Sequence, residues 1–122
     1  MDILFIYLSA ATIFITAIIH SLLGERRLIS PILALGEGPL QHLMVRQLIR
    51  FAWHFTSVLM FLSAVVLLIV ANMPSSSARY IIAVIGLTYL AVGLFDGVVS
   101  RGKHIGWWFL TAAGGLALMA FV

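Results

Sequence analysis

The chain has 122 residues, of which 63% are hydrophobic and only 9% are charged. A soluble domain is about half apolar and about a quarter charged, so water would not dissolve a surface of this composition and lipid is expected to cover it. The absence of cysteine excludes disulfides, thiolate metal sites and iron–sulfur clusters.

Four apolar runs follow one another along the chain, and each is long enough to cross a bilayer as a helix, which takes about 20 residues. They cover residues 3–23, 51–71, 80–99 and 105–122, and the last is the shortest. Open strands would leave backbone groups unpaired in hydrocarbon, and the runs lack the alternation of a barrel strand. We therefore predict an all-α fold: one integral membrane domain of four spans, arranged as an up-down-up-down four-helix bundle.

The connections between the runs also carry helix signals. Ser30 and Pro31 are typical of a helix start and Gly36 of a stop, which predicts a short helix over about 30–36 lying on the membrane interface. Pro39 predicts that the second helix begins at about residue 39 and projects beyond the membrane. Pro74 and the serines 75–77 predict a tight turn before the third run.

The distribution of Lys and Arg predicts the orientation. The first and third connections hold almost all the basic residues: Arg26, Arg27, Arg46, Arg50, Arg101 and Lys103. Only Arg79 lies on the other side, so both basic loops are expected in the cytoplasm and both termini on the non-cytoplasmic side. We expect a multi-pass protein of a bacterial inner membrane. Its basic residues would contact anionic lipid head groups of the bilayer and not nucleic acid.

Four ionisable residues from four different runs fall at a similar depth. His20, His54 and Asp96 each lie about one turn inside the cytoplasmic boundary, and His104 opens the last run. Ionisable groups inside a span usually face the bundle and find partners. Imidazoles with a carboxylate suit a divalent transition metal such as zinc, copper or iron, with Glu25 as a further ligand. This pattern predicts an accessory metal carrier or a small metalloenzyme, and it leaves open whether the protein is an enzyme.

A basic stripe favours a second reading. His42, Arg46, Arg50 and His54 are spaced four residues apart and so share one helix face. Such a concentration of positive charge disfavours a bound cation, but it suits a b-type haem, whose propionates need cationic partners. The axial ligands would be His20 with His54 or His54 with His104. The propionates would be contacted by Arg46, Arg50 and Lys103. Trp53 would pack against the macrocycle.

A third alternative is a structural or accessory subunit without cofactor, in which the polar layer only ties the helices together. Gly93 and Gly97 form a small-xxx-small pair, and the last run is also rich in small residues. Such residues allow close helix packing, inside the bundle or in a homodimer. The small residues of the last run are Gly106, Ala113, Gly114, Gly115 and Ala117.

Overall fold

The computed structural model describes residues 1–73 and 75–122, and within these residues it contains helices and no strand. The elements are α1 (Ile3–Gly24), the π-helix η1 (Glu25–Ile29), α2 (Ser30–Ala34), the 3-10 helix η2 (Gly38–Gln41), α3 (Leu43–Ala71), α4 (Ser76–Val99) and α5 (Gly106–Met119). Three helical segments are long and apolar enough to cross a membrane: Ile3–Ala34, Leu43–Ala71 and Ser76–Val99. The predicted all-α fold is confirmed, and these three helices are consistent with a membrane protein.

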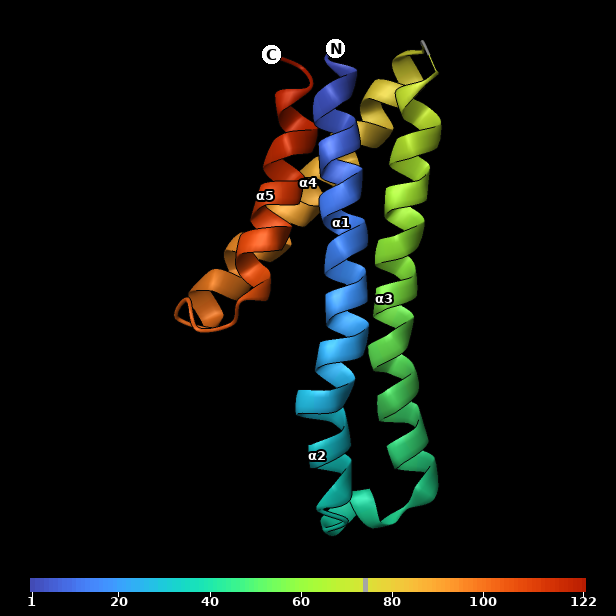
Figure 1. Cartoon of the computed structure of the whole chain (residues 1–122), viewed down its shortest axis with the longest axis vertical. Coiled ribbons are helices and arrows are strands. Elements are labelled where there is room, and N and C mark those ends of the chain that lie inside the picture. Colours follow the sequence, from blue (N-terminus) through green and yellow to red (C-terminus); the bar gives the residue numbers. More distant parts are fainter. Residues whose placement is uncertain (74) are drawn as a thin grey trace.

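The first helical segment differs from the prediction, because α1, η1 and α2 form one continuous rod of 32 residues (Figure 1). We expected a separate short helix over 30–36. Instead, the N–H of Ser30 donates to the carbonyl of Glu25, so a single wider turn joins the two helices without a break. Pro31 causes no interruption because it lies in the first turn of α2, where its missing N–H is tolerated. The rod ends before Gly36, whose φ of 61° is in the left-handed region.

The last helix is shorter than predicted. α5 has 14 residues, which corresponds to about 21 Å at 1.5 Å per residue, against roughly 30 Å of hydrocarbon in a bilayer. Arg101 and Gly102 have φ values of 53° and 72° and reverse the chain between α4 and α5, so regular helix begins only at Gly106. The prediction from hydropathy was therefore too long at both ends, because an apolar run does not show where the backbone turns.

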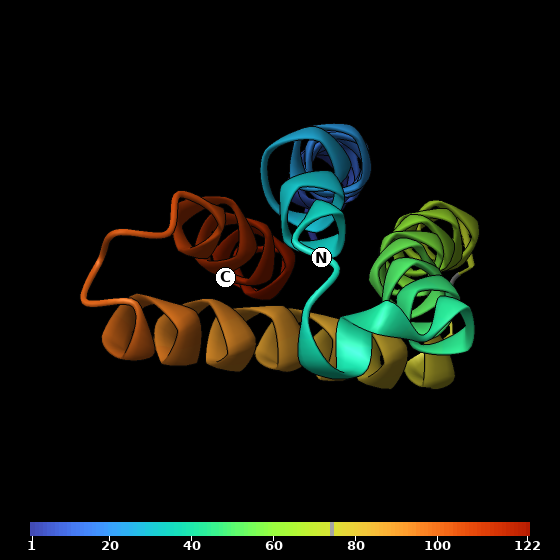
Figure 2. The same ribbon diagram turned by 90° about the horizontal axis from the view of Figure 1, so that it is seen from below.

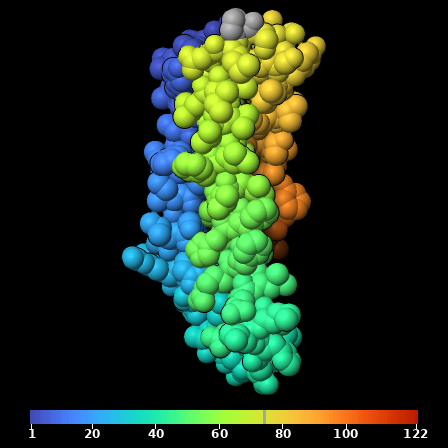
Figure 3. Space-filling model, turned by 90° about the vertical axis from the view of Figure 1, so that its right-hand side faces the viewer, coloured from blue at the N-terminus to red at the C-terminus, as the bar shows by residue number. Residues whose placement is uncertain are grey.

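The start of α4 agrees with the local sequence signals. Pro74 lies outside the described residues, but the Ser75 side chain accepts a hydrogen bond from the N–H of Ala78 (3.1 Å) and so caps α4. At the other end of the bundle, the long α3 projects with η2 beyond the α4–α5 turn, as the space-filling view shows (Figure 3).

The helices pack as two pairs that diverge. α1 packs against α3 and α5, and α5 packs against α4, whereas α3 and α4 touch much less. The N–H of Asp2 donates to the carbonyl of Ala120 (2.8 Å), so the two termini lie at the same end, called here the termini end (Figure 1). Toward the opposite end, α4 and α5 lean away from α1 and α3 (Figures 1 and 2). The four-helix bundle with up-down-up-down topology that we expected stays a prediction.

The apolar core lies toward the termini end, where the two pairs meet. Its largest buried side chains come from α1, α3 and α4, and small residues of α5 fill the space between them: Ile6, Ile13, Leu67, Ile82, Ala113 and Ala117. Most other large apolar side chains point outward. This distribution is typical of a protein whose surroundings are apolar, since such side chains would be costly in water.

The small residues of α4 and α5 are used inside the chain. A Cβ added at Gly93 would lie 2.5 Å from the backbone nitrogen of Thr111, and one at Gly97 would lie 3.2 Å from the Trp107 ring. Both glycines thus let α5 approach α4 closely. The structure thus shows packing inside the chain, one of the two roles that we expected for these glycines, and the homodimer stays a prediction.

Ser9 provides a test of how α1 and α5 are held together. Its hydroxyl is fully buried and donates to the carbonyl of Ala113 (2.7 Å). Ser9→Ala is expected to lower the unfolding free energy in detergent by about 0.6 kcal/mol, and at most about 1.7 kcal/mol, the range for interhelical hydrogen bonds in membranes. Thr12→Val is the control, because the Thr12 hydroxyl bonds only to Leu8 of its own helix. Equal stabilities of the two variants would contradict a role of Ser9 in joining the helices.

Candidate functional site

A large cavity lies between the two helix pairs. Its volume is about 870 Å³, it is partly open to the outside, and α1, α3, α4 and α5 all contribute to its lining. Most lining side chains are apolar, such as Leu59, Val92 and Phe109. Pockets for small molecules usually measure about 300–1,000 Å³ and are mainly apolar with a few polar groups. This cavity has the size and the character of such a binding site.

The hydroxyl groups and the ionisable groups of the cavity line different parts of its length. Hydroxyl groups of Thr16, Ser63 and Tyr89 line the part nearer the termini end. The ionisable side chains line the part toward the α4–α5 turn and are His20, Arg27, Asp96, Lys103 and His104. A molecule bound here would therefore meet apolar walls along most of its length and charged groups at one end.

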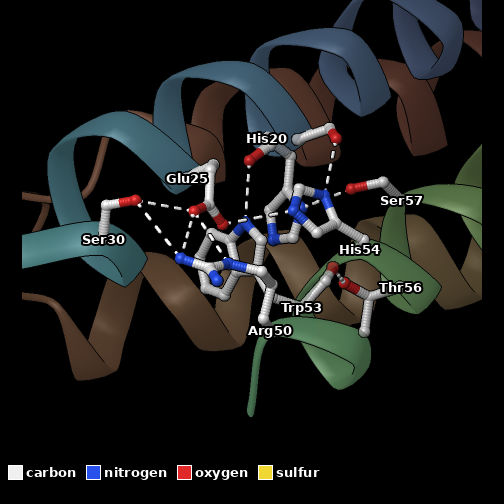
Figure 4. A network of polar contacts seen from close by, with 9 residues as sticks. His20, Glu25, Ser30, Arg50, Trp53, His54, Thr56 and Ser57 are labelled. Carbon is white, nitrogen blue, oxygen red and sulfur yellow. Dashed lines mark hydrogen bonds and ion pairs between the residues drawn. The ribbon is translucent and has the colours of Figure 1, made fainter. Parts of the chain in front are cut away.

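His20 is held in a fixed orientation by α3. Its Nδ1 and the Ser57 hydroxyl are hydrogen-bonded (2.8 Å), and its ring stacks on Trp53 with 4.1 Å between the ring centroids (Figure 4). Trp53 in turn donates its Nε1–H to the carbonyl of His20 (2.9 Å). Gly24 makes this possible, because a Cβ there would lie 2.6 Å from Trp53 Nε1. The imidazole of His20 therefore lines the cavity in a fixed orientation.

The second imidazole of the cavity is anchored in the same way. His104 Nδ1 lies 2.6 Å from Asp96 Oδ2, a short charge-assisted hydrogen bond between the α4–α5 turn and α4. The side chain of His104 is 56% exposed and that of Asp96 is 26% exposed. Both histidines therefore use Nδ1 for an internal hydrogen bond, and in the described residues neither Nε2 has a hydrogen-bond partner.

A second polar cluster joins η1 to α3, and we call it the Glu25 clamp. It consists of Ser21, Glu25, Ser30, Arg50 and His54 (Figure 4). Arg50 donates to Glu25 Oε1 through Nε (3.0 Å) and a terminal nitrogen (2.9 Å), and the Ser30 hydroxyl donates to the same oxygen (2.7 Å). His54 Nε2 lies 3.2 Å from Glu25 Oε2, and its Nδ1 lies 2.9 Å from the Ser21 hydroxyl.

The clamp leaves little of its hydrogen-bonding capacity unused. If His54 is neutral and donates Nε2–H to Glu25, its Nδ1 accepts from Ser21, so both ring nitrogens are engaged. Both carboxylate oxygens of Glu25 are engaged as well. The π-helical turn of η1 places Glu25 opposite Arg50, and turns of this kind are frequent at specialised sites. The clamp is suited to holding α1 and α3 together.

The five predicted metal ligands do not form one cluster. Glu25 and His54 belong to the clamp, whereas His20, Asp96 and His104 line the cavity. Across residues 1–73 and 75–122, no group of three or more His, Asp or Glu side chains is arranged to hold a metal ion. Equal depth in the membrane does not determine the direction in which each side chain points, and that direction separates the two sets.

The residues predicted to contact haem are also divided. Trp53 and Lys103 line the cavity, but Arg50 is bound to Glu25, and Arg46 is exposed and does not line the cavity. Of the predicted axial pairs, both include His54, which lies in the clamp. The sequence analysis missed Arg27 as a cavity residue, although it lies seven residues after His20 and so shares its helix face. It also missed Ser21 and Ser57 as the partners of His54 and His20.

Comparison with protein-family models, curated proteins and solved structures gave no match to this chain.

Proposed function

We propose that this protein lies in a membrane and binds a largely apolar small molecule in the cavity between its two helix pairs. The observation that carries the proposal is the cavity itself, with about 870 Å³ of mainly apolar volume that ends at a group of ionisable side chains. Burial of apolar surface contributes roughly 25 cal/mol per Å², so such a wall supplies affinity, and the few polar groups select the orientation of the bound molecule.

The proposed orientation places the ionisable end of the cavity at the cytoplasmic side. In this orientation the basic loops around Arg27 and Lys103 face the cytoplasm, and the termini lie on the other side of a bacterial inner membrane. The four apolar helices would follow an up-down-up-down path, with the short α5 embedded beside α1 and α4. A bound molecule would then enter the cavity from the inner leaflet.

The experiment that tests the binding site fills the cavity with a larger side chain. Val92→Trp places an indole in the cavity lining, whereas Val84→Trp places the same group on the exposed outer part of the same helix. Each protein is purified in mild detergent, and the co-purified molecules are measured by native mass spectrometry. We expect the retained fraction to fall at least about tenfold in Val92→Trp, equivalent to about 1.4 kcal/mol, and to be unchanged in Val84→Trp.

If both tryptophan variants retain the same molecules in the same amounts, the cavity is not the binding site. Thermal unfolding of the two variants serves as a check on the fold. A loss of ligand in Val92→Trp at an unchanged melting temperature assigns the loss to the filled cavity.

A second candidate function is haem binding, and the anchored histidines favour it. Haem is flat and apolar with two acidic groups, and His20 and His104 each keep Nε2 without a hydrogen-bond partner in the described residues. Arg27 and Lys103 would contact the propionates. Protein from haem-replete cells would then show a Soret band that His20→Gln and His104→Gln abolish and His42→Gln retains. Colourless wild-type protein would eliminate this candidate and leave the general proposal intact.

A further inference from the structure

The ionisable end of the cavity has a surplus of positive charge. The basic side chains of Arg27 on η1 and of Lys103 on the α4–α5 turn both line the cavity. Among the described residues, Asp96 is the only acid in the lining, and it is already bound to His104. A bound molecule therefore meets at least one uncompensated cation at this end.

On this basis we propose that the cavity holds an anionic phospholipid, with its phosphate between Arg27 and Lys103 and an acyl chain along the apolar wall. This inference rests on the proposed binding function and specifies its ligand. Arg27 and Lys103 are both exposed, so a head group at the membrane surface can reach them. Arginine pairs with phosphate through two parallel hydrogen bonds, and lysine acts as a point charge. An uncharged head group lacks the negative charge that both interactions require.

The anchoring hydrogen bonds suit the same ligand. His20 Nε2 and His104 Nε2 are directed by Ser57 and Asp96. His20 can donate from Nε2 to a phosphate oxygen while its Nδ1 accepts from Ser57, and His104 can donate from both ring nitrogens as the imidazolium. The phosphate would join α1 to the α4–α5 turn. Among the hydrogen bonds and ion pairs of the described residues, none links these two elements at this end.

The test uses vesicles and nanodiscs of defined lipid composition with the full chain. Wild-type protein is placed in a bilayer of phosphatidylcholine and phosphatidylglycerol and is then released from it. The lipids that stay bound to the protein are measured by native mass spectrometry. We expect phosphatidylglycerol to be enriched over its share of the bilayer. Arg27→Gln and Lys103→Gln should each reduce the enrichment about fivefold, as expected for the loss of one basic side chain near an anionic surface.

Two controls separate this site from general attraction between basic residues and anionic lipid. Arg26→Gln removes the same charge from the neighbouring position, which is exposed but does not line the cavity, and should leave the enrichment unchanged. Arg27→Lys keeps the charge and should retain most of the enrichment, which guards against a folding defect. Equal losses in Arg26→Gln and Arg27→Gln would overturn the inference.

Further arms distinguish failure of the inference from failure of the binding function. If the bound lipids have the same composition as the bilayer but Val92→Trp still loses them, the inference of an anionic phospholipid fails and the proposed binding function stands. If Val92→Trp expels nothing, both fail. Millimolar inorganic phosphate should not displace the bound phospholipid. Displacement by phosphate would identify the free anion as the ligand and overturn the lipid assignment.

Discussion

Gly114→Ala is expected to destabilise the protein by about 1–3 kcal/mol, the usual cost of overpacking a well-packed interior. A Cβ at this position would lie 2.6 Å from the carbonyl oxygen of Gly86 and 2.7 Å from Cα of Leu90. These atoms belong to the backbone of α4, which cannot rotate away as a flexible side chain could. The substitution must therefore push α5 from α4 along their whole contact, and the melting temperature in detergent should fall.

Gly115→Ala is the matched control for this prediction. It lies on the same helix, one residue further on, and a Cβ there would have no atom within 4 Å outside its own helix surroundings. Because alanine favours helix over glycine by up to about 1 kcal/mol, Gly115→Ala should be neutral or slightly stabilising. Equal destabilisation by the two substitutions would contradict the close approach of α4 as the cause, because the helix propensity of alanine is by itself stabilising.

The same contact explains the shape of the cavity. Gly86, Gly93 and Gly114 let the backbones of α4 and α5 approach closely, so the two helices form one tightly packed pair. This pair meets α1 and α3 mainly through the core near the termini end and leans away from them at the other end (Figures 1 and 2). The space that opens is the cavity with His20 and His104 in its lining. Helix packing by small residues thus creates the candidate site.

Hydropathy predicted the helical segments well but not their directions. The runs at 3–23, 51–71 and 80–99 correspond to α1, the later part of α3 and most of α4, because burial in lipid requires long apolar helices. The lean of α4 depends on which glycines face α5, and an apolar run does not show this. The continuation of α1 into α2 depends on one π-helical turn, for which the sequence analysis had no signal.

The candidate site was predicted in part. His20, Asp96, Lys103, His104 and Trp53 were all selected from the sequence, and all line the cavity. Depth along the helix axis was enough to select them. Depth does not predict the direction in which each side chain points around its helix axis. That direction places Glu25 and His54 in the clamp. Their partners are Ser21 for His54 and Arg50 for Glu25. The spacing of four residues places Arg50 on the helix face of His54, but spacing within one helix does not show which residues of another helix that face contacts.

Glu25→Gln is expected to lower the melting temperature more than any other single removal of an acidic charge in this chain. Glu25 contacts three side chains, those of Ser30, Arg50 and His54, and its own side chain is only 23% exposed. Glutamine keeps the size and one acceptor oxygen, but it leaves the Arg50 guanidinium without a counter-charge and cannot accept with both ends. Thermal unfolding followed by circular dichroism in detergent measures the change.

Glu37→Gln is the control for this prediction, since Glu37 is exposed and its side chain makes no hydrogen bond or ion pair among the described residues. A double variant, Glu25→Gln with Arg50→Gln, separates the ion pair from the rest of the clamp. Because the two residues interact directly, Arg50→Gln should cost less stability in the Glu25→Gln background than in the wild type. Strictly additive effects would show that Arg50 and Glu25 act independently. The clamp would then owe its contribution to His54 and Ser30.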